Sequence, residues 1–75
     1  MTKTFTAYVE LDEETGLYVG TVPGLPGAHS QGETLDELQK NLAEVIELVL
    51  EEMRARGDAA DPPPFVGIQQ IAVNV

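Results

Sequence analysis

The sequence predicts an α+β domain with the element order β-β-β-α-β, in which a single long helix covers one face of an antiparallel sheet. Alternating apolar residues flank a turn-rich segment near the N-terminus, and an amphipathic pattern with helical spacing extends over residues 35–56. A further alternation closes the chain after three consecutive prolines. Because 75 residues and 8.1 kDa leave room for one hydrophobic core only, we expect a single domain over residues 1–75.

The first two strands are predicted to form a β-hairpin. Apolar and polar residues alternate from Thr4 to Leu11, which is typical of a strand with one buried face. Residues 12–16 are turn formers that end in a glycine, and a second apolar run follows over residues 17–22. Tyr8 and Tyr18 lie opposite the main apolar sets of their strands, so we expect both on the uncovered side of the sheet.

A bend and a short third strand are predicted to follow. Residues 23–27, with the sequence Pro-Gly-Leu-Pro-Gly, cannot continue a ladder because proline lacks the amide donor and glycine has no side chain to pack. Residues 28–31 then extend again and form the third strand.

Thr34 is predicted to cap a helix over Leu35–Arg56. Its hydroxyl is placed to accept from an open amide of the first turn, and Glu37 is placed to reach back to the Thr34 amide. Gly57 offers the left-handed residue that ends a helix. Eight apolar side chains share one arc that must cover the sheet: Leu35, Leu38, Leu42, Val45, Ile46, Val49, Leu50 and Met53.

The C-terminal segment is predicted to return to the sheet as a fourth strand. Three prolines at residues 62–64 stiffen the chain. Ile71, Val73 and Val75 then alternate with small or polar residues, as expected of a strand over Ile68–Val75.

The charge of the chain restricts its partners. Thirteen acidic and four basic residues give a formal net charge of -9, which disfavours direct nucleic-acid binding and favours a basic protein partner. The chain has no cysteine, and therefore no disulfide, thiolate metal site or cysteine nucleophile. No apolar run approaches the length of a membrane span, and the N-terminus lacks the regions of a signal peptide, so we expect a soluble cytoplasmic protein with no membrane partner.

The residues indicate binding rather than catalysis. His29 is the single histidine and has no adjacent nucleophile or carboxylate in sequence, and the acidic residues lie in the hairpin turn and along the outer helix face. We therefore predict no catalytic residues, no metal, no cofactor and no small-molecule substrate. One helix leaves part of the sheet uncovered, which favours a homo-oligomer, either a dimer or a tetramer.

The run of residues 16–38 resembles the HicB family of type II antitoxins. It combines an aromatic-containing strand, a Pro-x-Leu-Pro-Gly bend at residues 23–27, a Ser-x-Gly-Glu-Thr segment at residues 30–34 and a Glu-rich helix. The resemblance implies a partial ribonuclease-H-like fold without that enzyme's active site. It also implies an antitoxin that binds and masks HicA, a small basic mRNA-cleaving toxin with a double-stranded-RNA-binding-domain fold.

The resemblance leaves two interpretations open. The first is a HicB-like antitoxin that masks a HicA-like toxin; the second is an orphan HicB-like homo-oligomer with a structural or regulatory role. Full-length members of the family usually carry a C-terminal DNA-binding module, and we expect that module to be lacking here because the sequence stops where the fourth strand ends. The residues expected to contact a partner are Tyr8, Tyr18, Leu25, Pro26 and His29.

Overall fold

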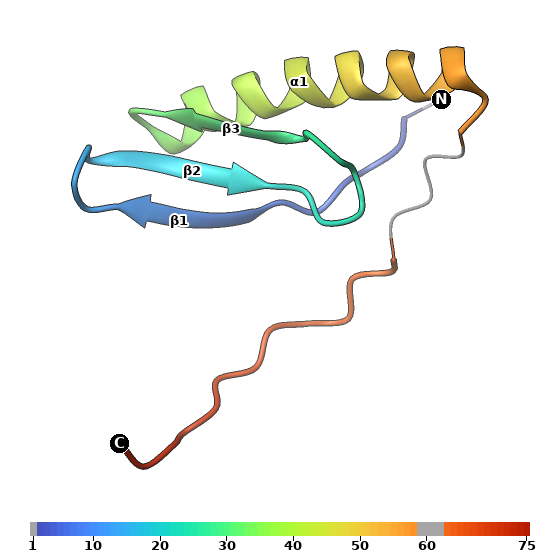
Figure 1. Ribbon diagram of the computed structural model, residues 1–75. Coiled ribbons are helices and arrows are strands. Elements are labelled where there is room, and N and C mark those ends of the chain that lie inside the picture. Colours follow the sequence, from blue (N-terminus) through green and yellow to red (C-terminus); the bar gives the residue numbers. More distant parts are fainter. Residues whose placement is uncertain (1, 59–62) are drawn as a thin grey trace.

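The computed structural model describes residues 2–58 and 63–75 and contains a three-stranded antiparallel sheet and one long helix (Figure 1). The elements are β1 (Tyr8–Asp12), β2 (Leu17–Thr21), β3 (His29–Gly32) and α1 (Leu35–Arg56). The sheet has the order β1-β2-β3, and α1 packs along β3 and β2. The α+β class, the three N-terminal strands and the bounds of the helix are confirmed.

The turn between β1 and β2 is held by local hydrogen bonds. Gly16 adopts a φ of 74° and donates its amide to the carbonyl oxygen of Asp12 at 2.8 Å. The Asp12 carboxylate accepts from the amide of Glu14 at 3.1 Å, and the Thr15 hydroxyl accepts from the amide of Leu17 at 3.2 Å. Turn chemistry that is entirely local therefore fixes the hairpin.

The helix begins and ends where the capping residues predict. The Thr34 hydroxyl accepts from the Glu37 amide at 3.0 Å, and Gly57 follows the last turn with a φ of 78°. The expected reciprocal bond differs, because the Glu37 carboxylate accepts from the amide of Glu33, at 3.3 Å, and not from that of Thr34. Thr34 itself is extended (φ -129°, ψ 163°), as is usual for a residue that caps a helix.

Two glycines bring the helix close to the sheet. A Cβ atom added at Gly20 would lie 2.7 Å from Cδ1 of Leu42, and one added at Gly32 would lie 2.6 Å from the backbone nitrogen of Leu38. Leu38 is 2% exposed. The first half of α1 can therefore pack at this distance only because β2 and β3 have no side chain at these two positions.

The core lies beside the second half of α1. Val22, Leu25, Ala28 and Met53 form one buried cluster, against which further apolar side chains pack: Phe5, Ala7, Ile46, Val49 and Leu50. The predicted apolar arc of α1 is only partly covered, because the helix packs on β3 and β2 and its side toward the N-terminal segment stays open.

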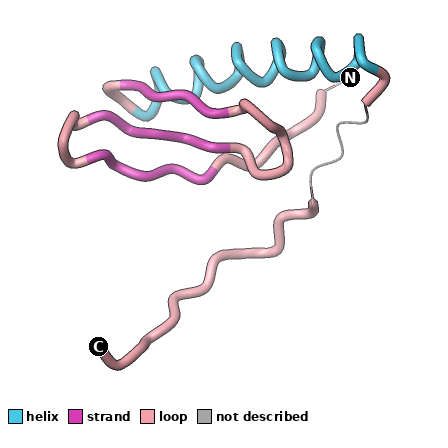
Figure 2. Tube along the Cα trace, in the orientation of Figure 1, coloured by secondary structure: helices cyan, strands magenta, loops and turns pink. Residues whose placement is uncertain are grey.

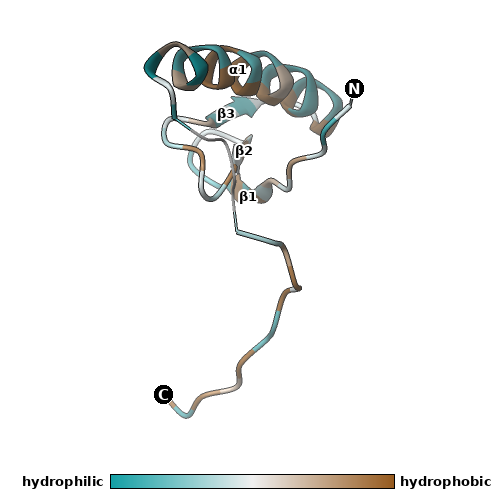
Figure 3. Cartoon of the chain, turned by 90° about the vertical axis from the view of Figure 1, so that its right-hand side faces the viewer, coloured by the Kyte–Doolittle hydropathy of each residue, from teal (hydrophilic) through white to brown (hydrophobic). Residues whose placement is uncertain are grey.

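The fourth strand predicted over Ile68–Val75 is wrong for this fold, since no strand follows α1 in the described residues. Residues 63–75 run as an extended segment that leaves the body near the start of β1 (Figures 1 and 2). An alternating segment becomes a strand only where a ladder partner lies alongside it, and here it diverges from β1. Figure 3 shows its hydrophobic stretches standing clear of the body.

Candidate partner-binding face

The sheet face opposite α1 is uncovered and carries one row of side chains across all three strands. Tyr8 of β1 pairs with Thr21 of β2, and Thr21 pairs with His29 of β3. Residues that are directly opposite in antiparallel strands project to the same face. Tyr8 and His29, both expected to contact a partner, are therefore brought onto one exposed surface, which we call the open face.

A second row gives the open face an apolar centre and an acidic end. Glu10 pairs with Val19, and Val19 pairs with Gln31. Val19 is half-buried, whereas Glu10 and Gln31 are exposed. Asp12 continues the same face of β1 toward the hairpin turn, where two more glutamates follow. The face thus combines a tyrosine, a histidine and carboxylates around an aliphatic centre.

Tyr18 lies on the other face of the sheet, so its expected position is wrong. It pairs with Leu11 and Gly32, and Gly32 faces α1. The sequence pattern of β2 is misleading because Gly20, the residue nearest the helix, has no apolar side chain to mark the covered face. Tyr18 is half-buried beside the start of α1 and does not share a surface with Tyr8.

The bend after β2 divides its two predicted contact residues between surface and core. Pro26 is exposed, whereas Leu25 is 3% exposed and packs in the core cluster with Val22 and Ala28. The Leu25 amide donates to the carbonyl oxygen of Val22 at 3.3 Å, and the Ala28 amide donates to that of Leu25 at 3.0 Å. These two turns fold Leu25 inward, so its side chain does not face a partner.

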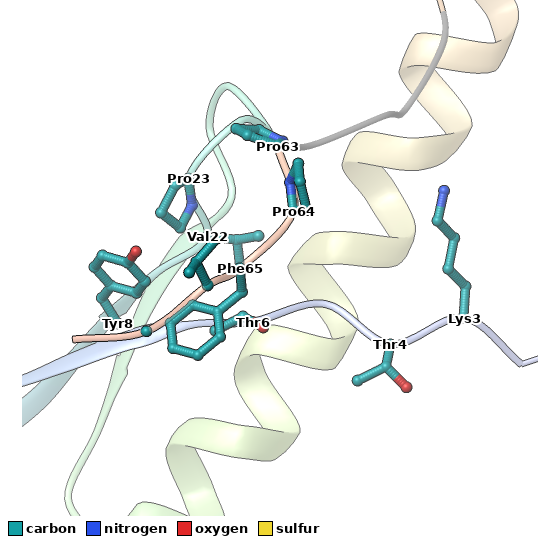
Figure 4. Close-up of a pocket in the computed structure, with 11 residues that line it drawn as sticks. Lys3, Thr4, Thr6, Tyr8, Val22, Pro23, Pro63, Pro64 and Phe65 are labelled. Atoms are coloured by element: carbon teal, nitrogen blue, oxygen red, sulfur yellow. The ribbon is translucent and has the colours of Figure 1, made fainter.

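Phe65 completes one end of the open face, and the sequence pattern alone did not single it out. Its ring packs edge-on against that of Tyr8, with centroids 6.2 Å apart (Figure 4). A pocket of about 490 Å³ lies here between the C-terminal segment and the body, lined by Thr6, Val22 and Pro23 among others. The one available signal was an aromatic residue directly after the prolines.

Within residues 2–58 and 63–75, no three histidine, aspartate or glutamate side chains gather closely enough to hold one metal ion. The outer side of α1 is exposed and mainly acidic, with Asp36, Lys40, Glu44, Glu47 and Glu51. In the described part of the chain, no helix combines the length and apolarity needed to cross a bilayer.

Comparison with known proteins gives one family and several relatives. A family model described as the HicB-like antitoxin of bacterial toxin-antitoxin systems matches residues 5–73. A UPF0150 protein of Thermotoga maritima is 48% identical over 72 residues, which cover 96% of this chain and 92% of the relative. UPF0150 proteins of Synechocystis and Archaeoglobus fulgidus are 46% and 42% identical, over 92% and 93% of this chain and 93% and 94% of theirs. No solved structure matches the chain.

Proposed function

Because the chain belongs to the HicB-like antitoxin family, we propose that it is a non-catalytic module that binds a small basic HicA-like toxin and masks its RNA-cleaving centre. The observation that carries this proposal is the charge, with 13 acidic residues against four basic ones and a net charge of -9. A field of this sign accelerates encounter with a basic protein and repels RNA. Because the proposed toxin would act on mRNA, this role belongs to the cytoplasm in our proposal.

The open face supplies the contacts that such a partner requires. Tyr8 is 50% exposed and lies in one row with His29, and Glu10 and Asp12 follow on the same face of β1. Aromatic side chains act as anchors in protein interfaces, and carboxylates pair with the lysines and arginines of a basic surface. Pro26, which is exposed on the bend between β2 and β3, is a further contact residue in this proposal. Occupation of the toxin's basic surface by this face would exclude RNA sterically and electrostatically.

A second candidate function rests on the exposed apolar C-terminal segment. Val66 is 94% exposed and Ile68 is 81% exposed, which favours self-association of the chain. The names of the UPF0150 relatives state no toxin and no activity. The alternative is therefore a homo-oligomeric HicB-like protein with a structural or regulatory role and no toxin partner.

A matched pair of charge reversals tests the antitoxin role. Glu10→Lys alters the open face, and Glu44→Lys makes the same change on the exposed outer side of α1, so both raise the net charge by two. Where a HicA-like basic protein is encoded beside this gene, that protein serves as the probe: it is made catalytically inactive and titrated by calorimetry. We expect Glu10→Lys to weaken binding at least about tenfold, and Glu44→Lys to leave it within about threefold, because only the first charge lies in the contact.

Growth of the host separates the two candidate functions. Expression of the active toxin should arrest growth, and co-expression of this chain should restore it, whereas the Glu10→Lys variant should restore it poorly. If Glu10→Lys and Glu44→Lys bind the toxin equally well, the toxin does not contact the open face. Absence of binding and of rescue with the wild-type chain would contradict the antitoxin role and leave the homo-oligomeric alternative.

A further inference from the structure

The C-terminal segment, residues 63–75, has the composition of a buried strand but the exposure of a surface. Ile71 and Val73 are 72% and 71% exposed, and Val75 is exposed as well. These three side chains alternate with Gln70, Ala72 and Asn74, so an extended chain presents them on one side. Exposed apolar segments of this kind aggregate or find a partner.

The segment is also the uncharged part of a strongly acidic chain. Residues 63–75 contain no ionisable side chain, whereas all 17 charged side chains precede residue 63. Two acidic copies repel one another at a distance. The segment therefore brings no charged side chain to a second copy, so it can approach acidic surfaces with little added repulsion.

The body offers a matching site between β1 and α1. In the sheet formed by the described residues β1 is an edge strand, and Val9 and Leu11 on its helix-side face are 46% and 55% exposed. A groove of about 1020 Å³ separates this strand and the N-terminal segment from the helix. Its apolar lining includes Phe5, Ala7, Val9, Leu42, Ile46 and Leu50. An added strand beside β1 would gain ladder hydrogen bonds and bury one of its faces in this groove.

The path of the chain directs this strand away from its own groove. Phe65 packs on Tyr8, which belongs to the open face (Figure 4), whereas the groove is lined by residues on the helix side of β1. From Phe65 onward the segment diverges from the body, as Figure 1 shows. Three prolines in a row also stiffen the sequence just before this point, which disfavours a reversal of the chain there.

We propose that residues 68–75 of one copy add to the β1 edge of a second copy, with Ile71, Val73 and Val75 in its groove, and that the exchange is reciprocal. Two identical contacts related by a two-fold axis close a dimer and cover residues 68–75 of both copies. The occupant is a second copy of this chain, because the segment and the groove belong to every copy and both present exposed apolar side chains. This assembly uses the β1 edge and leaves the open face free, so it stands independently of toxin binding.

A matched pair of substitutions tests the exchange by sedimentation velocity at micromolar concentration. Val73→Asp places a charge on the apolar side of the segment, and Asn74→Asp places the same charge on the opposite side, one residue away. Wild type and Asn74→Asp should sediment at twice the 8.1 kDa mass of one copy, and Val73→Asp should dissociate at least about a hundredfold more readily. A monomeric wild type, or a dimer that responds equally to both changes, overturns the proposal.

A measurement on the wild type covers the case in which Val73→Asp fails to fold. Isotope-labelled and unlabelled copies are mixed, and nuclear Overhauser contacts between the two kinds of copy are recorded by filtered spectroscopy. Contacts from the Val73 methyl groups to Ala7, Val9 or Ile46 of the other copy support the exchange. If these contacts occur only within one copy, the segment folds back on its own sheet. If no such contact is found, any dimer forms through another surface. Either result overturns the proposed exchange.

Discussion

The two edges of the sheet differ in how they are closed. At the β3 edge, Asn41 of α1 donates its side-chain amide to the carbonyl oxygen of Gln31 at 2.8 Å, and Leu38 packs over Gly32. At the β1 edge, in contrast, Val9 is 46% exposed and α1 makes no close approach to the described strand. The β3 edge is closed by the element that directly follows it in sequence. The β1 edge requires a segment from far along the chain or from another molecule.

This difference separates the part of the molecule that stabilises a single copy, at the β3 edge, from the part that is open to binding, at the β1 edge. Short connections form early and cost little loop entropy, so a strand followed at once by a helix is covered within one chain. An edge strand left without such a neighbour is a template for pairing with another strand. We therefore expect the molecule to fold around β2, β3 and α1 and to associate through β1.

The largest effect is expected for removal of a core side chain at the closed edge. Leu38→Ala should lower the free energy of unfolding by about 3 kcal/mol, because Leu38 is 2% exposed and its loss leaves a cavity between α1 and the two glycines. Leu48→Ala removes the same atoms from a position that is 63% exposed and should cost about 0.5 kcal/mol. Urea denaturation measures both, and equal costs would show that the closed edge does not carry the stability.

A smaller effect is expected where the helix touches the backbone of β3. Gly32→Ala places a Cβ atom 2.6 Å from the backbone nitrogen of Leu38, which cannot move as a flexible side chain would, so we expect a cost of about 2 kcal/mol. Gly67→Ala adds the same atom where nothing lies within 4 Å and should change stability by less than about 0.5 kcal/mol. Thermal unfolding of both variants measures these two costs. An unchanged stability of Gly32→Ala would mean that α1 does not pack closely against the backbone of β3.

The smallest effect is expected for the hydrogen bond that covers the β3 edge. Asn41→Ala removes the donor to the Gln31 carbonyl oxygen and should cost about 1 kcal/mol. Gln39→Ala, on an exposed position of the same helix, serves as the control. Faster amide exchange in β3 for Asn41→Ala alone is the expected result. Unchanged exchange would show that this contact does not protect the edge.

The sequence predicted those features that depend on neighbouring residues. The helix over Leu35–Arg56 was predicted at both ends, because Thr34 and Gly57 act on the turns next to them. The hairpin turn followed in the same way from residues 12–16. These are local interactions, and their energies do not depend on how the rest of the chain packs.

The features that the sequence did not predict depend on distant contacts. The covered face of β2 is marked by Gly20 rather than by an apolar side chain, so Tyr18 was placed on the wrong side. Leu25 was expected on the surface, and only the packing of the bend against Met53 shows that it is core. The alternation of Ile71, Val73 and Val75 was recognised as that of a strand, yet periodicity does not tell which molecule supplies the ladder partner.

The central claim is that the β1 edge is completed by a second copy while the β3 edge is already closed. Amide hydrogen exchange across a dilution series of the wild-type chain tests it most directly, because an edge closed by another molecule reopens on dilution. We predict that protection of the β1 amides rises with protein concentration, together with that of residues 68–75, while protection of β3 stays constant. Protection of β1 that is the same at every concentration would contradict the account.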